Sequence, residues 1–396
     1  MAFRKLINCL VCNSKNLKQV LNLNKQPLAN SFLIKKNSKE KKYDLKVNCC
    51  LNCTHLQLSL SVDPKIIYTK YDYVSGTTST YKNYMKEFFK FCLKNTNKIK
   101  YKNILDIGCN DGSQLDVFKR NKFNTFGVDP AKNIYKISSK KHKIFCEFFN
   151  DHFVKKTNQK FDIIISQNSF AHNPNPKKFL ENVKKIMHFN SSIFIQTSQA
   201  DMCKNNEFDT IYHEHINFFN VRSMDKLVKR CGLKLDQVVK NPIHGTSYIF
   251  VIKFNSNQKK IKRILKKEKF LKYNFYKKWG KNCLRNILII KREIKKIKKE
   301  NILIGYGAAA KANTFLNFSK IKPNYIIDDN KLKQNKFCPG SKVPIKSINT
   351  LKKFKKNIYF IPLAWNFYKE IKMRILKVRK NYNDKFIVCF PKFKID

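Results

Sequence analysis

Long hydrophobic runs are missing from this chain. None of its apolar stretches approaches the ~20 residues that a membrane-spanning helix needs. The N-terminal stretch MAFRKLINCLVCNSK has a basic start but only a very short apolar segment, which does not fit a signal peptide. These two absences predict a cytoplasmic protein with no membrane partner.

Arginine is scarce for a chain this basic. Lys and Arg together number 82 against 27 acidic residues, for a formal net charge of +55, yet only nine of them are Arg. Proteins that bind nucleic acids favour Arg for base edges and phosphates and gather their cations in a patch. Here Lys is spread along the whole chain beside abundant Asn, Ile and Phe, a mixture that suggests the bias of an A/T-rich genome. A nucleic-acid partner is therefore disfavoured, although the charge alone would permit one.

Apolar residues are plentiful enough for more than one core. The chain has 396 residues, of which 42% are hydrophobic and 13% aromatic. This length exceeds what one core usually fills, so we expect two or three domains.

Four of the thirteen cysteines form two C-x-x-C pairs, Cys9 with Cys12 and Cys50 with Cys53. Two such pairs complete a tetrahedral four-sulfur site, which suits a structural Zn²⁺ because no position is left open for water. Cys49 could compete with Cys50, but only Cys50 has the two-residue spacing to Cys53. Two reduced thiol pairs without metal are the alternative. A disulfide framework does not fit a cytoplasmic chain.

Most other cysteines stand singly inside apolar runs. Cys146, Cys231 and Cys389 are examples. A free cysteine in such a run usually behaves as a small buried hydrophobic residue, and we expect this of all three.

Residues 102–130 contain a strand, a glycine loop, a helix and a second strand. The first strand holds Ile104 to Ile107, the loop is 108–112, and the second strand, 126–128, ends in Asp129. Glycines let a ligand touch the backbone, and an acid about 20 residues after the loop can accept both ribose hydroxyls. An ordinary glycine turn without a ligand is the alternative.

The loop favours S-adenosylmethionine over NAD. Its pattern is D-x-G-x-x-x-G, and the carboxylate of Asp106 would repel a pyrophosphate but suit the cationic amino group of a methionine moiety. The pattern resembles the first motif of the class I methyltransferases. That resemblance implies a cofactor site lined by Asp106, Gly108, Asn110 and Gly112, with Asp129 on the ribose, and adds Asn168 further along the chain.

Five further strands complete an α/β domain of this class. We expect them at 143–147, 161–166 and 192–197, followed by a hairpin of 234–239 and 247–254. Five parallel strands closed by a hairpin is the class I methyltransferase arrangement. Ligands in such sheets bind beyond the carboxyl ends of the strands, so functional residues should follow the strands.

Histidines stand at these positions, although the chain has only eight. His172 follows the fourth strand, the segment Tyr212-His213-Glu214-His215 follows the fifth, and His244 lies in the hairpin turn. Histidine is the usual general base near neutral pH. A hydrogen-bonding loop residue is the alternative for His172, and a metal site is a weaker alternative for His213 with His215.

The last third of the chain predicts basic helices and a second Rossmann-like unit. Residues 257–300 show the helical periodicity of a pair of amphipathic helices packed between domains, and we expect Gly280 to break or kink the run. A helix that binds a membrane surface or a nucleic acid is the alternative. A G-x-G-x-x-A loop then begins at Gly305, and its helix N-terminus, with Lys311, could bind a pyrophosphate. Its strands are expected at 301–304, 325–328, 357–362 and 386–390.

The chain resembles, almost end to end, the sugar C-methyltransferases that act on nucleotide-linked keto-deoxysugars. The matching stretches are the paired C-x-x-C head, YDYVSGTTST, LDIGCNDGSQL, QNSFAHNPN, YHEHINFF, HGTS, GYGAAAKANTFLNF, IDDNKLKQNKFCPGSKVPI and LAWNF. The implied fold is α/β: a class I methyltransferase Rossmann-like sheet with an N-terminal zinc-binding head and a second, C-terminal Rossmann-like domain. The implied segments are 1–60 (zinc head), 61–100 (helical connector), 101–255 (cofactor domain), 256–300 (helical linker) and 301–396 (nucleotide-sugar domain).

The resemblance also implies a mechanism and a substrate site. His215 would be the base that removes the proton beside the 4-keto group, Tyr212 and Glu214 would bind or polarise the sugar, and His172 and Tyr73 would lie near the enolate. The substrate contacts implied by the matching motifs are His244, Ser247, Lys311, Asn313 and Asn366. Two positions depart from the usual pattern, Thr246 in HGTS and Gly76 in YDYVSGTTST, and both concern the substrate.

Two other functions stay open at this point. One is a methyltransferase of another acceptor, such as a small-molecule hydroxyl or a nucleic acid. The other is a nucleotide-sugar binding module that keeps the cofactor pocket without transferring a methyl group. The sequence does not decide the sugar, its nucleotide, the stereochemistry or the oligomeric state, for which a monomer is one option.

Overall fold

A computed structural model describes residues 2–69, 79–198 and 201–396. The chain folds into two compact units. The first comprises Met1–Lys18, Asn48–Ala200 and Glu214–Tyr273, and the second Gln19–Val47, Asp201–His213 and Asn274–Asp396. The candidate Tyr73 lies outside the described residues. The five-segment division drawn from the sequence stays a prediction.

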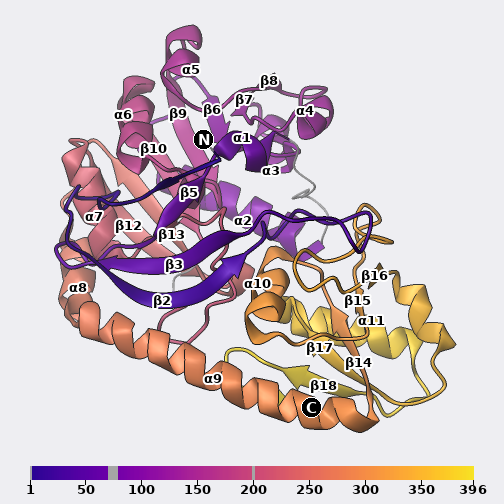
Figure 1. The fold of residues 1–396 in the computed structure, drawn as a ribbon. Coiled ribbons are helices and arrows are strands. Elements are labelled where there is room, and N and C mark those ends of the chain that lie inside the picture. Colours follow the sequence, from indigo (N-terminus) through magenta and orange to yellow (C-terminus); the bar gives the residue numbers. More distant parts are fainter. Residues whose placement is uncertain (1, 70–78, 199–200) are drawn as a thin grey trace. The chain divides into compact units, whose positions relative to one another are not determined.

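The first unit is built on a seven-stranded sheet of order β12-β13-β10-β9-β6-β7-β8 (Figure 1). Its strands are β6 (Asn103–Ile107), β7 (Asn124–Val128), β8 (Lys143–Phe145), β9 (Phe161–Gln167), β10 (Met187–Thr197), β12 (Lys234–Asn241) and β13 (Ser247–Lys253). The pairs β10–β9, β6–β9, β6–β7 and β7–β8 are parallel, whereas β13 is antiparallel to both β10 and β12. The predicted arrangement of five parallel strands and a closing hairpin is confirmed.

Helices cover both faces of this sheet (Figure 1). They are α2 (Ser79–Lys94), α3 (Ser113–Arg120), α4 (Lys132–Ser138), α5 (Asp151–Lys156), α6 (Pro176–Lys185), α7 (Val221–Arg230) and α8 (Lys259–Lys267). Strand side chains alternate between the faces, so Ile104 packs with α2 and α3, while Leu105 packs in the core that includes α6 and α7. The two cores leave the carboxyl ends of the strands available for a site.

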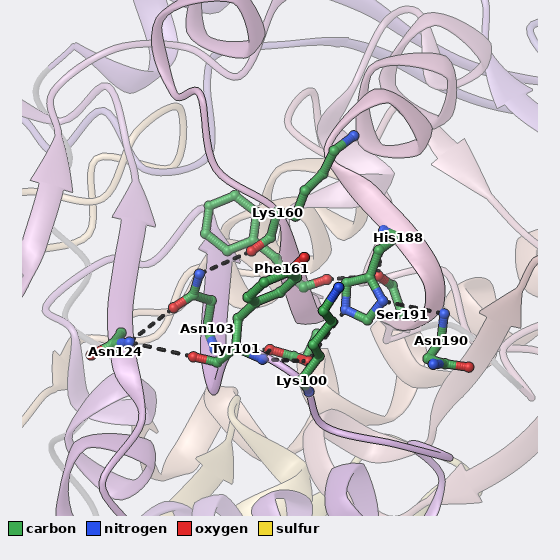
Figure 2. Close-up of polar contacts among 10 residues, drawn as sticks. Lys100, Tyr101, Asn103, Asn124, Lys160, Phe161, His188, Asn190 and Ser191 are labelled. Carbon is green, nitrogen blue, oxygen red and sulfur yellow. Dashed lines mark hydrogen bonds and ion pairs between the residues drawn. The ribbon is translucent and has the colours of Figure 1, made fainter.

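The amino ends of the strands are fastened by polar contacts (Figure 2). Asn103 Nδ2 donates to the Lys160 carbonyl at 3.0 Å, and Asn124 Nδ2 donates to Asn103 Oδ1 at 3.0 Å. The buried carboxylate of Asp162 accepts the N–H of Asn103 at 3.0 Å and lies 3.2 Å from His188 Nε2. This edge of the sheet is therefore occupied by structural contacts, at the end opposite to the glycine loop.

Short strands near the N-terminus and just after His215 complete the first unit. They are β1 (Phe3–Lys5), β5 (Leu60–Val62), β4 (Leu56–Leu58) and β11 (Asn217–Phe218). β1 pairs with β5 and β4 pairs with β11, both antiparallel. Helix α1 (Pro64–Tyr68) follows, with Asp63 accepting the N–H of Lys65 as its cap.

The second unit holds a six-stranded sheet of order β16-β15-β14-β17-β18-β19 (Figure 1). The strands are β14 (Ile302–Tyr306), β15 (Tyr325–Ile327), β16 (Ile345–Lys346), β17 (Ile358–Pro362), β18 (Lys385–Val388) and β19 (Lys394–Ile395). All neighbours are parallel except β18 with β19. The other elements of this region are β2 (Leu17–Gln26), β3 (Tyr43–Cys50), α9 (Tyr273–Glu300), α10 (Ala310–Ser319) and α11 (Tyr368–Val378). A second Rossmann-like sheet is therefore present, as the sequence predicts.

Two expectations from the sequence are wrong. Gly280 does not break the helical run, because it lies inside α9, and the chain leaves helix near Leu271 instead. A Cβ at Gly280 would lie 1.9 Å from the Val20 carbonyl oxygen, so the glycine permits a close backbone approach. Cys146 is exposed rather than buried, because it follows β8 at the edge of the sheet, whereas Cys231 and Cys389 are buried as expected. In the described part of the chain, no helix combines the length and apolar character that a membrane crossing requires.

Candidate active site and metal centre

The four cysteines of the two C-x-x-C pairs converge on one point. Their Sγ atoms all lie within 4.8 Å of one another, with 3.5 Å between Cys9 and Cys53 and 3.5 Å between Cys12 and Cys50. Four thiolates at ~2.3 Å from a tetrahedral zinc ion lie ~3.8 Å apart, so the set fits Zn²⁺. Cys49 is not part of the group, because its Sγ faces the Cys50 carbonyl at 3.6 Å. The structure thus brings the four predicted ligands together at one point.

Two matching turns present these thiols. The turns close through N–H donations from Asn13 to the Cys9 carbonyl, from Thr54 to Cys50, from Cys9 to Ser14 and from Cys50 to His55. The residue after the second cysteine has a positive φ in both, 65° at Asn13 and 62° at Thr54. Because the backbones match, each turn directs two sulfurs to the same side, as a structural zinc site without an open position requires.

Hydrogen bonds hold the glycine loop of the first unit against the ends of β6 and β7. Gly108 has a φ of 81°, and its N–H donates to the Val128 carbonyl at 2.8 Å. Asn110 also has a positive φ, 49°, and its N–H donates to Asp129 Oδ2 at 3.0 Å. The second oxygen of Asp129 accepts the N–H of Ala131 at 2.9 Å. The acid at the end of β7 is thus fixed beside the loop, where a ribose would be held.

Three carboxyl groups give this loop a negative character. Burial, followed by the charges of Asp129 and Asp111, raises the pKa of Asp106 well above its ordinary value. Burial also raises the pKa of Asp129, although the N–H donors of Ala131 and Asn110 act in the opposite direction. A cationic ligand would relieve this repulsion, whereas a pyrophosphate would increase it. These carboxyl groups therefore fit the positively charged ammonium and sulfonium groups of S-adenosylmethionine.

Ser169 supports the same loop from the neighbouring strand. Its Oγ donates to the Ile107 carbonyl at 2.6 Å and lies 2.7 Å from Ser166 Oγ. Asn168, just before it, adopts a φ of 56° and donates its N–H to the Gln196 carbonyl at 3.0 Å. Within the described residues, the buried Asn168 Oδ1 has no hydrogen-bond partner. Strained backbone and an unpaired buried acceptor are typical of ligand sites.

Three aromatic rings stack beside this edge of the sheet. His172 lies between Tyr68, with ring centroids 5.6 Å apart, and His215, with centroids 5.2 Å apart. Tyr68 Oη also donates to the Glu214 carbonyl at 3.4 Å. Burial lowers the pKa of His172 to about 4, so its ring is neutral at physiological pH. The structure thus brings together His172, Glu214 and His215 from the predicted site.

Tyr68 and Gln196 belong to this region but were not among the sequence candidates. Tyr68 ends the short helix α1, and a single tyrosine after two isoleucines gives no functional signal. Gln196 at the end of β10 accepts from Tyr84 Oη at 2.6 Å and from Gln167 Nε2 at 3.1 Å. Its position could have been found by looking for polar residues that end predicted strands.

Tyr212 and His213 belong to the second unit. The His213 ring contacts Tyr43 edge-on at 5.8 Å, and its Nε2 lies 3.3 Å from the Tyr43 carbonyl. Burial lowers the pKa of His213 to about 4. Among the residues that the structure describes, only the four-cysteine set groups three or more potential metal ligands. In this part of the chain, His213 and His215 therefore have no third ligand with which to form a metal site.

The substrate candidates fall into two places. In the first unit, Ser247 is buried and its Oγ donates to the Ile243 carbonyl at 2.8 Å, whereas the side chain of His244 lies outside what is described. In the second unit, Lys311 Nζ donates to Asn366 Oδ1 at 3.2 Å. Asn313 is buried and donates through Nδ2 to the Ala29 carbonyl at 2.7 Å. The structure brings Lys311 and Asn366 together beside the second glycine loop.

Trp365 and Asp209 are polar partners in the second unit that the sequence did not suggest. Lys311 Nζ lies 4.6 Å from the centroid of the Trp365 ring, and Trp365 Nε1 donates to Asp209 Oδ2 at 2.7 Å. Burial raises the pKa of Asp209, while Lys311 and the Trp365 N–H act in the opposite direction. Lys311 thus lies next to the Trp365 ring, and the indole N–H is bonded to the buried carboxylate of Asp209.

The second glycine loop repeats the backbone pattern of the first. Gly307 has a φ of 95° and donates its N–H to the Ile327 carbonyl at 2.7 Å. The N–H of Ala308 donates to Asp328 Oδ2 at 2.7 Å, while Asp328 Oδ1 accepts the N–H of Asn330 at 2.9 Å. An acid that ends a strand thus holds a glycine loop in both units. The second loop is therefore held by the same kind of backbone contacts as the first.

Comparisons with known proteins cover almost the whole chain. Three family models match it: a zinc binding domain over residues 9–68, a methyltransferase domain over 78–238 and a C-methyltransferase C-terminal domain over 242–391. The C-methyltransferase NovU of Streptomyces niveus is 23% identical over 413 residues, which cover 99% of this chain and 97% of that protein.

Solved methyltransferases resemble less than half of the chain. A S-adenosylmethionine-dependent methyltransferase from Clostridium acetobutylicum is 14% identical, with a TM-score of 0.36, over 44% of this chain and 92% of that one. A SAM dependent methyltransferase from Archaeoglobus fulgidus is 14% identical, with a TM-score of 0.36, over 43% and 94%. The family models, together with the four-cysteine centre, establish the family. The chain belongs to the S-adenosylmethionine-dependent C-methyltransferases that carry an N-terminal zinc-binding domain.

Proposed function

We propose that this enzyme methylates C3 of a nucleotide-linked 4-keto-deoxysugar, with His215 as the base. The observation that carries the proposal is the stack of His215 on His172, beside the carboxyl ends of β9 and β10. Carbon is a poor nucleophile until it loses a proton, so C-methylation needs a base that O-methylation of an acidic hydroxyl can do without. A keto group next to the reacting carbon makes that proton removable.

The residues divide the work as follows. His215 takes the proton from C3, and the electron pair of the C3–H bond moves through C4 to the carbonyl oxygen. His172, neutral because of its low pKa, can donate a hydrogen bond to that oxygen without giving up its proton. Glu214 and Tyr212 bind the neighbouring hydroxyl groups. His244 and Ser247 complete the sugar contacts.

S-adenosylmethionine, when bound, supplies an activated methyl group, so the protein's main contribution to transfer is alignment. Asp106, Gly108, Asn110, Gly112, Asp129 and Asn168 form the proposed cofactor contacts. Asp106 would hold the ammonium group and Asp129 the ribose hydroxyls. With the cofactor bound, its sulfonium would supply the methyl group to C3 and depart as the neutral thioether, while the electron pair of the enolate restores the C4 carbonyl.

The second unit is proposed to hold the nucleotide of the substrate. Lys311 offers a cation at the first turn of α10, where a helix N-terminus already favours anions. Asn366 holds the Lys311 amine, and Asn313 has a buried Oδ1 that finds no partner within the described residues. These groups suit a diphosphate and a polar base or sugar hydroxyl.

The test is a transfer assay with methyl-labelled S-adenosylmethionine and a panel of dTDP-, GDP- and CDP-linked 4-keto-6-deoxyhexoses, read by mass spectrometry. We expect a labelled sugar whose methyl group resists ether-cleaving reagents. His215→Ala should lose turnover while keeping cofactor affinity. His152→Ala, which changes an exposed histidine paired with Glu147, is the matched control and should behave as the native enzyme.

Two results would point elsewhere. A labelled product that ether-cleaving reagents demethylate would mean another acceptor atom. Tight cofactor binding with no labelled sugar from any member of the panel would favour another acceptor or a binding module.

A further inference from the structure

A buried side-chain bridge connects the four-cysteine head to the segment that carries the two stacked histidines. His55 lies two residues after the ligand Cys53, and its Nε2 is 3.1 Å from Asn217 Oδ1. Asn217 lies two residues after His215. Both side chains are fully buried, with no exposed surface on either residue. A polar pair of this kind is stable only with well-placed partners, so the position of each residue depends on the other.

Asn217 also holds the loop that contains His172. Its Nδ2 donates to the Ala171 carbonyl at 3.3 Å and to the Asn173 carbonyl at 2.8 Å. Two carbonyl oxygens can accept only from the amide nitrogen, which fixes the orientation of the Asn217 side chain. Its oxygen must then face His55, so the proton of the His55 ring sits on Nε2. One amide therefore links the metal-binding turn to the residues on both sides of His172.

Backbone pairing reinforces this bridge. Strand β4 leaves the second cysteine turn and pairs with β11, with Gln57 opposite Asn217. The N–H of Leu58 donates to the Ile216 carbonyl at 2.9 Å, and the N–H of Ile216 donates to the Ala171 carbonyl at 3.0 Å. Ile216 thus lies between the zinc head on one side and the His172 loop on the other, directly after His215.

The other cysteine turn reaches the same strand. Gln57 accepts the N–H of Leu10 through Oε1 at 2.8 Å and donates through Nε2 to the Asn8 carbonyl at 3.0 Å. Leu10 lies between Cys9 and Cys12, so β4 is tied to both halves of the metal centre. Closing the two turns on one ion fixes the position of β4, and β4 fixes β11.

We infer that the zinc head is a positioning device for the catalytic histidines, with His55 and Asn217 as the positioning residues that couple the metal centre to His172 and His215. The role of the two histidines rests on the proposed function, but the coupling itself is a property of the fold. Structural zinc sites are commonly regarded as sources of stability alone. Here the residues that follow the ligands also set the spacing of a stacked imidazole pair.

The experiment compares Asn217→Ala with His55→Ala and His55→Gln, with His152→Ala as the control. Asn217→Ala removes the bridge completely, and His55→Ala removes its first link. His55→Gln keeps a donor at about the distance of Nε2 and should restore the native behaviour. Each purified protein is measured for zinc content, affinity for S-adenosylhomocysteine, and turnover.

The decisive readout is the NMR spectrum of ring-labelled histidine, which needs no substrate. We expect the His172 and His215 signals to move in Asn217→Ala, to move less in His55→Ala, and to return in His55→Gln. Zinc content and cofactor affinity should stay at the native level, while kcat falls about 10- to 100-fold, as misplaced catalytic groups commonly cause. Chelating zinc from the native protein should move the same two signals.

The outcomes separate this inference from the proposed function. Unmoved His172 and His215 signals in folded, zinc-loaded Asn217→Ala would overturn the positioning role. Loss of zinc or of cooperative unfolding from Asn217→Ala and both His55 variants would also overturn it, because the bridge would then serve stability. Moving signals in a protein that methylates no sugar would support the coupling and contradict the proposed function.

Discussion

Gly108 offers a quantitative test of the cofactor loop. Its φ of 81° lies in the left-handed region, and a Cβ there would stand 2.6 Å from Ser169 Cβ and 2.7 Å from Ser169 Oγ. For Gly108→Ala, the backbone conformation costs ~1–2 kcal/mol. Overlap with a packed neighbour adds ~1–3 kcal/mol, because Ser169 is held by its hydrogen bond to the Ile107 carbonyl. We expect the free energy of unfolding to fall by about 2–5 kcal/mol.

A double-mutant cycle separates these two contributions. Ser169→Gly removes the atoms that the new methyl group would strike, so it should rescue the overlap in Gly108→Ala but not the backbone cost. The coupling energy from urea unfolding should therefore be about 1–3 kcal/mol in the stabilising direction. S-adenosylhomocysteine affinity, measured by calorimetry, should stay reduced in the double variant because the left-handed strain persists. Additive single-variant effects, within about 0.5 kcal/mol, would refute the close approach of Ser169.

Three further predictions concern the metal, the cofactor and the long helix. Cys50→Ser should bind much less zinc than the native protein, whereas Cys49→Ser should keep its zinc, as measured by atomic emission. Equal zinc content in the two variants would contradict the ligand assignment. Because the pKa of Asp106 is raised, binding of the cofactor's ammonium group should release a proton from this carboxyl group. Cofactor affinity should therefore rise with pH, and the heat of binding should depend on the buffer. Both effects should vanish in Asp106→Asn. Gly280→Ala should lower the free energy of unfolding by about 1–3 kcal/mol despite the better helix propensity of Ala, because the new Cβ would overlap the Val20 carbonyl oxygen. Lys281→Ala, at an exposed position of the same helix, should have little effect. An unchanged free energy of unfolding in Gly280→Ala would contradict the close contact.

Local patterns in the sequence predicted local structure well. The strands of both sheets follow from apolar runs, and the glycine loops follow from residues that tolerate a positive φ, as Gly108 and Gly307 show. The four metal ligands were also predicted, because the spacing within each C-x-x-C pair fixes where two sulfurs can point. In each case the determining residues are close together along the chain.

Local patterns failed where the surroundings decide. Cys146 lies in an apolar run, but the run borders an edge strand, so one side of it faces solvent. Gly280 has a low helix propensity, yet the helix continues through it because the absence of a side chain permits the approach of the Val20 carbonyl. Neither outcome can be deduced from neighbouring residues, because each depends on which element packs against the position.

By itself, the sequence determined the class of fold and the four cysteines that converge on one point. It also predicted the residues of the cofactor loop. The tertiary structure decided which side chains meet: Tyr68 with His172, His172 with His215, His55 with Asn217, and Trp365 with Asp209. The physical reason is distance along the chain. His55 and Asn217 are 162 residues apart, and a hydrogen bond between them exists only after the strands that carry them have paired.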